Sequence, residues 1–243
     1  MTARLHRFTQ IDSTLDVIHG LAAEGAAEGT VVVAEEQLEG RGSRGQTWHS
    51  PPGGLWLSVL CRPATAVGVE VLSLRAGLAV AEALDDFGGL PPVTLKWPND
   101  IMLGDRKLGG ILCEARWQGS APAWVAIGLG LNVVNPIPAE IREAATNLAA
   151  CRADLRPGDL LPTIISRLST LGAGGPELSE TELAAFARRD WLRGRVLAQP
   201  AAGIALGVRS DGSLEVRGCG GELSAARAGH VELAASAPPS PAP

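Results

Sequence analysis

A glycine-rich segment followed at once by prolines constrains this chain more than any other stretch of it. Residues 40–54 read Gly-Arg-Gly-Ser-Arg-Gly-Gln-Thr-Trp-His-Ser-Pro-Pro-Gly-Gly. The first six fit the dinucleotide pattern G-x-G-x-x-G, which requires a helix to begin at the glycines and hold a pyrophosphate. The prolines and glycines at 51–54 prevent such a helix from continuing. The segment therefore predicts a mobile loop whose two guanidinium groups, from Arg41 and Arg44, can fold over an anionic small molecule.

Length and composition restrict the class of protein. The chain has 243 residues, 46% of them hydrophobic, and a formal net charge of −5. This suits one large domain, or one large and one small, with a substantial core. An acidic chain has no overall electrostatic footprint for nucleic acid or anionic lipid, so any cationic site must be local. No signal peptide and no apolar run of membrane-spanning length is evident. We expect a cytoplasmic protein without a membrane partner.

Cysteine spacing indicates reduced thiols. The four cysteines are far apart and form no C-x-x-C pair, which argues against a disulfide framework and a zinc site. They are Cys61, Cys113, Cys151 and Cys219.

Local patterns predict an α+β fold rather than a strict series of βαβ units. Helices are expected from the capping residues at 12–14 to Ala23 and over 69–87, 139–145, 160–171 and 180–192. Strands are expected over 30–35, 54–61, 93–97, 101–103, 107–114 and 124–129.

The last part of the chain has a different pattern. From about Gly194, short apolar pairs are separated by Gly, Asp-Gly and Gly-Gly, which predicts a small all-β module. Residues 237–243 contain only Pro, Ser and Ala and are expected to be disordered. The predicted boundaries are 1–190 for the larger domain, 191–236 for the β module and 237–243 for the tail.

Four segments carry polar residues in unusual density. They are Asp12-Ser13-Thr14, Gln37 with the loop to Trp48, Lys96-Trp97-Pro98-Asn99-Asp100-Ile101 with Lys107 seven residues after Asp100, and Gly128-Leu129-Gly130-Leu131-Asn132. Each has a purely structural explanation: a helix cap, a solvated loop, an Asx turn with a hairpin lysine, and a strand end. Each segment also has a functional explanation. The hydroxyls at 13–14 can bind a neutral ligand, the cations of the loop and of the lysines can bind phosphate, and the carboxylate of Asp100 can bind Mg²⁺.

Other kinds of chemistry find little support. The sequence has no G-x-S-x-G, no P-loop Gly-Lys-Ser/Thr and no His/Cys metal spacing, and its four histidines are scattered. Fixed cations without an obvious nucleophile suit a reaction that depends on positioning and on stabilising charge at phosphorus.

Taken together and in this order, the four segments resemble those of biotin–protein ligases. The matching residues span roughly Phe8 to Val133 and include Gly40-Arg41-Gly42 through Trp48-x-Ser50-Pro51, Gly54-Leu55-x-Leu57-Ser58, Lys96 to Ile101, Lys107-Leu108-x-Gly110-Ile111-Leu112-x-Glu114, and Gly128-x-Gly130-x-Asn132. The Lys-Trp-Pro-Asn-Asp run with its later lysine is the most specific of them.

The resemblance implies a fold and an activity. The fold is a mixed central β-sheet flanked by helices, of the class II synthetase-like type, followed by a small SH3-like β-barrel. The activity is ATP-dependent: biotin and ATP form biotinyl-5′-AMP, and the biotinyl group then passes to a lysine of a biotin carboxyl carrier protein domain. ATP, biotin and Mg²⁺ are the implied substrates and cofactor.

The resemblance also implies roles for individual residues. Lys107 and Arg41 are expected to be catalytic, and Asp100 to bind Mg²⁺. The biotin-binding residues are expected to be Ser13, Thr14, Gln37, Gly40, Arg41, Gly42, Ser43, Arg44, Trp48, Lys107 and Gly110. The ATP-binding residues are expected to be Trp48, Asn99, Asp100, Lys107 and Asn132. Whether Trp48 bounds the biotin tail or the adenine is left open.

The loop departs from the family pattern Gly-Arg-Gly-Arg-x-Gly/Asn-Arg-x-Trp. Its second arginine position holds Ser43 and its third holds Gln46, while Arg44 is offset by one. We hypothesise that Arg44 partly substitutes for the missing cations or that the adenylate is held less tightly. Leu15 also stands where many relatives have a polar residue.

Partners and alternatives complete the expectations. The few residues before Asp12 leave no room for a helix-turn-helix, so a ligase without direct DNA binding is expected. A homodimer is plausible. The alternatives are a lipoate–protein ligase or octanoyltransferase of the same superfold, and a non-catalytic biotin-binding regulator.

Overall fold

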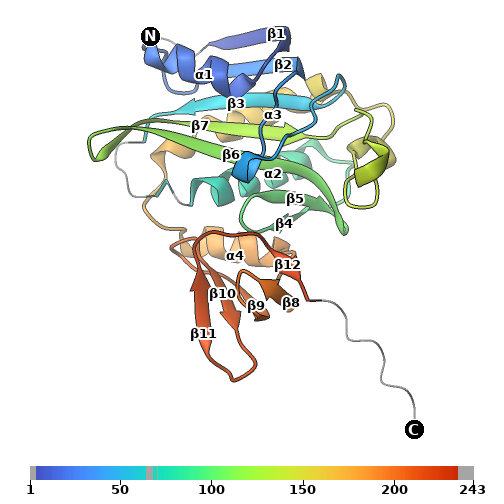
Figure 1. The fold of residues 1–243 in the computed structure, drawn as a ribbon. Coiled ribbons are helices and arrows are strands. Elements are labelled where there is room, and N and C mark those ends of the chain that lie inside the picture. The colour runs from blue at the N-terminus through green and yellow to red at the C-terminus, as the bar shows by residue number, and fades with distance from the viewer. Residues whose placement is uncertain (1–3, 64–67, 70, 235–243) are drawn as a thin grey trace.

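A mixed seven-stranded β-sheet lies at the centre of the computed structural model, which describes residues 4–63, 68–69 and 71–234 (Figure 1). Its strand order is β1-β2-β3-β7-β6-β5-β4. The strands are β1 (Leu5–Ile11), β2 (Val31–Gln37), β3 (Leu55–Cys61), β4 (Thr94–Lys96), β5 (Asp100–Leu103), β6 (Arg106–Gln118) and β7 (Ala121–Leu131).

The sheet begins with one parallel pair and continues antiparallel. β1 and β2 are parallel, joined by α1 (Thr14–Ala23), whereas the pairings from β2–β3 to β5–β4 are antiparallel. Parallel neighbours require a crossover, and here α1 is that crossover. Since the carboxyl end of β1 leads into α1 and that of β2 into the glycine-rich loop, Ser13 and Gln37 meet at the same end of the sheet.

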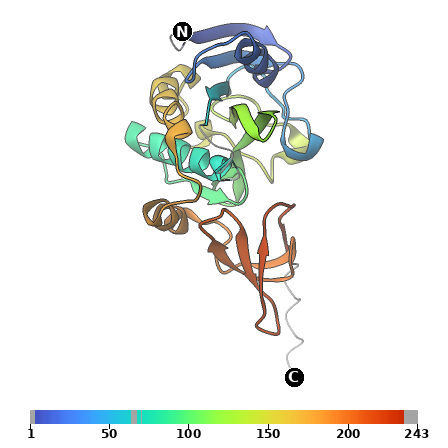
Figure 2. The same cartoon turned by 90° about the vertical axis from the view of Figure 1, so that its left-hand side faces the viewer.

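The two faces of the sheet are covered by different helices (Figure 2). Alternate residues of the strands point to opposite faces. On one face α1 packs Leu15 and Ile18 over Val32 and Ala126. On the other face α2 (Leu72–Phe87) and α3 (Pro157–Leu168) cover the larger core, which includes Val59, Ile111 and Ile127. None of the helices in the described part of the chain combines the length and the apolar character needed to cross a membrane.

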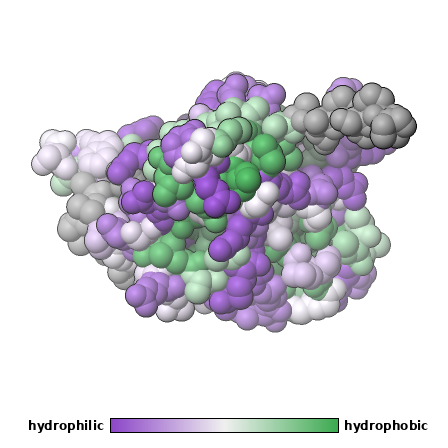
Figure 3. All heavy atoms as spheres, turned by 90° about the horizontal axis from the view of Figure 1, so that it is seen from below, coloured by the Kyte–Doolittle hydropathy of each residue, from purple (hydrophilic) through white to green (hydrophobic). Residues whose placement is uncertain are grey.

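A five-stranded antiparallel sheet follows the helix α4 (Glu180–Arg189) and confirms the predicted all-β module. Its order is β11-β10-β9-β8-β12, formed by β8 (Val196–Gln199), β9 (Gly203–Val208), β10 (Leu214–Arg217), β11 (Leu223–Ala226) and β12 (Glu232–Leu233). The face seen from the module's side mixes hydrophobic and hydrophilic residues (Figure 3).

The C-terminal module packs directly on the larger unit. Buried residues of the module, including Leu214 and Val216, belong to the same core cluster as Trp97 and Phe186. Trp97 is 1% exposed and its indole Nε1 donates to the carbonyl oxygen of Gly212 at 2.9 Å. Buried apolar contact and a satisfied indole together fix the module against the strand that leads to Asn99 and Asp100.

The predicted elements are confirmed within a few residues, with two exceptions. The strand β1 was not predicted, because the polar alternation of Leu5–Ile11 marks an edge strand with a weak apolar signal. The predicted helix 139–145 is only a 3₁₀ turn, η2 (Ala139–Ile141). Further 3₁₀ turns lie at η1 (Ser43–Gly45), η3 (Leu148–Ala150) and η4 (Leu171–Ala173). The predicted disordered tail at 237–243 lies outside the described residues.

Candidate active site

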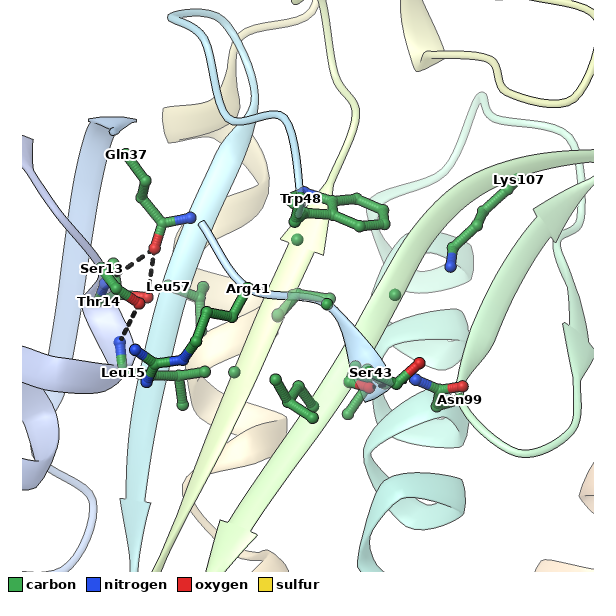
Figure 4. Close-up of a pocket in the computed structure, with 17 residues that line it drawn as sticks. Ser13, Thr14, Leu15, Gln37, Arg41, Ser43, Trp48, Leu57, Asn99 and Lys107 are labelled. Carbon is green, nitrogen blue, oxygen red and sulfur yellow. Dashed lines mark hydrogen bonds between the residues drawn. The ribbon is translucent and has the colours of Figure 1, made fainter. Parts of the chain in front are cut away.

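The glycine-rich loop, residues 40–54, covers a pocket at the end of the sheet where α1 begins (Figure 4). The pocket is narrow, with about 40 Å³ of free space between its walls. Its walls come from α1, β2, β3, β6, β7 and the loop. The lining residues are Ser13, Thr14, Leu15, Gln37, Arg41, Gly42, Ser43, Trp48, Leu57, Asn99, Lys107, Gly110, Ile111, Leu112, Gly128, Leu129 and Gly130.

Glycines form the floor of the pocket. Gly110 on β6 pairs with Gly130 on β7, and Gly128 lies on the same face two residues earlier. The Trp48 ring rests on this bare backbone: a methyl group on Gly130 would lie 2.4 Å from Trp48 Nε1, and one on Gly110 would lie 3.4 Å from its Cζ3. Side chains at these positions would collide with Trp48 or Leu15, so the glycines make room for these residues against the strands.

Uncharged polar groups line the end of the pocket next to α1. Gln37 Oε1 accepts from the Thr14 backbone N–H at 2.8 Å and from its hydroxyl at 3.0 Å, while Gln37 Nε2 donates to Ser50 Oγ at 2.8 Å. Ser13 caps α1 by accepting from the Leu15 N–H at 3.3 Å. Within the described part of the chain, the Ser13 hydroxyl proton and the second N–H of Gln37 have no acceptor, so this end can donate two hydrogen bonds to a neutral acceptor.

Arg41 lines the pocket, but its guanidinium is occupied by carboxylates of the protein. Nη1 donates to both oxygens of Asp16 at 2.7 and 2.8 Å, and Nε lies 3.4 Å from Glu114 Oε1. Burial lowers the pKa of Arg41, but hydrogen bonding to Asp16 and the charge of Glu114 outweigh it and raise the pKa. Arg41 and Lys107, both expected to be catalytic, point to opposite ends of the pocket (Figure 4).

Lys107 lies at the other end of the pocket. Its Nζ is 2.5 Å from Asp100 Oδ1 and 5.1 Å from the centre of the Trp48 ring. The backbone of Lys107 is fixed on both sides, since its N–H donates to Ala144 and its carbonyl accepts from Thr146. A cation held by a carboxylate and an aromatic face is well placed to meet negative charge at the mouth of the pocket.

A second cavity of about 480 Å³ adjoins the pocket and shares Ser43, Asn99 and Lys107 with it. The C-terminal module forms its far wall, through the loop from Arg227 to Val231. The chain contains only two lysines, and both line this cavity. The lining residues are Ser43, Arg44, Val69, Ser73, Lys96, Trp97, Pro98, Asn99, Asp100, Lys107, Ile111, Leu112, Cys113, Arg227, Ala228, Gly229, His230 and Val231.

Positive charge dominates the second cavity. Lys96 is packed near Lys107 and Arg44, and burial together with these two cations lowers its pKa, against the opposing effect of Asp100. Such a cluster repels itself and is relieved by an anionic ligand. The second cavity therefore suits a polyanion such as a chain of phosphates.

Arg44 does not enter the first pocket. It is the one described non-glycine residue with positive φ, at 60°, and its Nη2 lies 3.0 Å from His230 Nδ1. This left-handed conformation costs about 1–2 kcal/mol in a non-glycine residue. Arg44 thus faces the second cavity and the C-terminal module, and it does not occupy the space that Ser43 leaves in the first.

Two predicted site residues are not brought to either cavity. Asn132 is 6% exposed, donates to the Thr146 carbonyl at 3.1 Å and accepts from Asn135 at 3.0 Å, so its amide belongs to a buried network behind the site. Gly40 is needed for close packing of the loop, because a methyl group there would lie 2.4 Å from the Trp48 carbonyl oxygen and 2.6 Å from Ser50 Oγ.

Several lining residues were not predicted as site residues. Leu112 faces the pocket, whereas Leu57, Ile111 and Leu129 line it while their side chains belong to the core on the other face of the sheet; the sequence marks all four only as strand residues. Arg227 and His230 reach the second cavity from far along the chain and carry no local signal. Gly128 and Gly130 belonged to the family pattern and could have been expected as a floor, because glycine within a strand marks a close approach.

A glycine floor, an uncharged hydrogen-bonding end and a cationic cavity therefore lie next to one another in one site. The model of the biotin/lipoate A/B protein ligase family matches residues 7–132, and the chain belongs to this family.

Individual relatives agree with this assignment. The chain is 38% identical over 144 residues to the bifunctional ligase/repressor BirA of Bacillus subtilis. This alignment covers 57% of this chain and 44% of BirA. It is 40% identical over 147 residues to the biotin–[acetyl-CoA-carboxylase] ligase of Mycobacterium tuberculosis, covering 57% and 52% of the two chains. The chain spans about half the length of these curated relatives.

The fold also has a solved counterpart over nearly its whole length. The biotin protein ligase of Aquifex aeolicus, solved in complex with biotin and ATP, superposes with a TM-score of 0.79 at 27% identity. The match covers 97% of this chain and 100% of that chain, so the C-terminal module is included.

Proposed function

We propose that the protein is a biotin–protein ligase, which joins biotin to AMP and then transfers the biotinyl group to a lysine of a biotin carboxyl carrier protein domain. The observation that carries this proposal is the position of Lys107, which lines both the uncharged pocket and the cationic cavity. A carboxylate at the end of the pocket and a phosphate in the cavity would meet at this ammonium group.

The pocket end near α1 would hold the ring system of biotin. A urea carbonyl is a neutral acceptor, and the Ser13 hydroxyl and the free N–H of Gln37 are the donors left to bind it. The apolar lining from Leu15 and Leu112 suits an aliphatic tail. The tail would then run beside the Trp48 ring and end at Lys107.

In the first step a biotin carboxylate oxygen attacks the α-phosphorus of ATP. The bond from this phosphorus to the bridging oxygen of the β-phosphate breaks, and pyrophosphate leaves with the bonding electrons. Negative charge grows on the phosphoryl oxygens, where Lys107 is held in place by Asp100. A preorganised donor of this kind contributes about 3 kcal/mol to transition-state stabilisation.

The cavity residues would hold the nucleotide and its ion. Lys96 and Arg44 would face the phosphates, and Asn99 is oriented by donating to the Ile111 carbonyl at 2.8 Å. Asp100 supplies a single carboxylate, which fits a Mg²⁺ ion held mainly by phosphate oxygens and water. When bound, Mg²⁺ would neutralise phosphate charge.

In the second step a lysine amine of the carrier domain attacks the carbonyl carbon of biotinyl-5′-AMP. The C–O bond to the phosphate breaks, AMP leaves and the nitrogen loses a proton, leaving an amide. We place the reaction in the cytoplasm, consistent with the four free thiols of the chain. The absence of DNA binding, homodimer formation and a domain boundary after residue 190 stay predictions.

Biotin-dependent exchange of labelled pyrophosphate into ATP tests the proposal directly. We expect exchange with biotin and none with lipoate or octanoate, since the uncharged end of the pocket is built to donate hydrogen bonds to a ring carbonyl. Biotin binding without exchange would mean a non-catalytic biotin-binding protein. Exchange that requires lipoate instead would mean the sister activity of the family.

Replacing Gly130 with alanine is expected to weaken biotin binding about tenfold. The new methyl group would lie 2.4 Å from Trp48 Nε1 and must displace the indole from the pocket floor. Overpacking of this kind costs about 1–3 kcal/mol. Isothermal titration with biotin measures the effect. Gly158→Ala is the matched control, because a methyl group there meets nothing within 4 Å. An unchanged dissociation constant for Gly130→Ala would rule out the proposed floor.

A further inference from the structure

Asp16, Glu114 and His19 form a network of side chains that holds Arg41 beside the pocket. Asp16 on α1 binds Nη1 of Arg41, and Glu114 on β6 lies 3.4 Å from its Nε. Two of the three guanidinium nitrogens are therefore held by the protein, while Nη2 has no partner among residues 4–63, 68–69 and 71–234. A guanidinium held on two nitrogens points its third in a fixed direction.

Glu114 is itself held by a buried histidine. Its Oε2 lies 3.0 Å from Nε2 of His19, which is 9% exposed. The other ring nitrogen, Nδ1, accepts from the Trp124 indole at 2.9 Å. An indole N–H can only donate, so Nδ1 carries no proton and Nε2–H donates to Glu114. Burial also lowers the pKa of His19, in agreement with a neutral ring.

The network lies on the same sheet face as the pocket floor. Along β6, Gly110, Leu112 and Glu114 point to one side, and the first two line the pocket. The surroundings of His19 are apolar, since Leu15, Ile18 and Ala22 of the same helix form a small core with Leu60 and Ala126. Polar groups in an apolar core are costly unless each has a hydrogen-bond partner. In this network both ring nitrogens of His19, the Trp124 indole N–H and both oxygens of Glu114 have one.

We propose that Glu114, oriented by His19 and assisted by Asp16, is a positioning residue that holds Arg41 in the wall of the pocket, at the end next to α1, for its contact with bound biotin. Glu114 and His19 do not touch the substrate; they act through Arg41. This inference rests on the function proposed above.

Coupling between Glu114 and Arg41 tests the inference. We expect Glu114→Gln to raise the KM for biotin in the exchange reaction about tenfold with little change in kcat. We expect Arg41→Gln to have a larger effect and to remove any further effect of Glu114→Gln, because residues that act through one contact are not additive. Asp16→Asn changes an exposed side chain and should give a smaller rise in KM without affecting folding.

The control is Glu82→Gln, which removes a carboxylate from an ion pair with Arg167 on the helical side of the molecule and should leave KM unchanged. A second readout is independent of catalysis: the ¹⁵N signal of Arg41 Nε–H should be protected from solvent exchange in the unmodified protein and lose protection in Glu114→Gln. Multiplicative effects in the double variant, or an unprotected Arg41 signal, would overturn the inference. If the unmodified protein shows no ATP–pyrophosphate exchange while its Arg41 Nε–H is protected from solvent, the proposed function is overturned instead.

Discussion

The Lys107→Ala variant is expected to lose the exchange activity by a factor of about 10²–10³ while still binding biotin. Lys107 is the cation common to the pocket and the second cavity, and its Nζ is held by Asp100 at 2.5 Å. Loss of one preorganised donor at developing negative charge typically costs this much in rate. Biotin binding persists because its ring would be held at the far end by Ser13 and Gln37. Initial rates of biotin-dependent ATP–pyrophosphate exchange and biotin titration give the two quantities.

Arg106→Ala is the matched control for Lys107→Ala. Arg106 precedes Lys107 on β6, is exposed and lines neither cavity. Removing it changes the net charge equally and should leave the exchange rate within about twofold, as expected for an exposed residue without a partner role. Full exchange activity in Lys107→Ala would exclude its catalytic assignment. Loss of biotin binding together with activity would mean that Lys107 shapes the pocket and has no specific role in the chemical step.

Local signals in the sequence were sufficient for the parts of the site that depend on neighbouring residues. Ser13 is both the predicted helix cap and a pocket residue, because a helix that starts at the end of the sheet presents its cap to the ligand. The prolines after the glycine-rich loop correctly excluded a helix there, and the loop covers the pocket. Asn99 and Asp100 follow a short strand, and this placed them near Lys107 in the neighbouring hairpin.

Contacts between distant segments could not be predicted in the same way. Arg41 was assigned to the ligand, but its nearest partners are Asp16 and Glu114, which come from two other elements. Arg44 meets His230, 186 residues later in the chain. An arginine pairs with whichever carboxylate or acceptor the fold brings near, and the sequence alone does not contain that distance.

The assignment of Asn132 shows a second limit. The family pattern marks the residue, but its amide is used within a buried network with Thr146 and Asn135. A polar residue at the end of a strand can face a ligand or satisfy a neighbouring loop, and the pattern of residues is the same in both cases. Burial at 6% and two internal hydrogen bonds favour the second explanation here.

Introducing the missing arginine by Ser43→Arg is expected to slow release of biotinyl-5′-AMP by about 10- to 100-fold. Ser43 lines both cavities, whereas Arg44 is directed to His230, so the loop brings no cation to the position where the family pattern has its second arginine. A hydrogen bond to a charged group contributes about 1.5–3 kcal/mol, which corresponds to this range.

Release is measured by the biotinylation of a lysine-rich bystander protein that has no carrier domain. The chain itself has only two lysines and consumes little released adenylate. Thr47→Arg is the control: it adds the same charge to the same loop, but at an exposed residue that lines neither cavity and stands at an unspecified position of the family pattern, and it should leave release unchanged. Equal bystander labelling by Ser43→Arg and the unmodified protein would mean that the loop holds the adenylate without this cation.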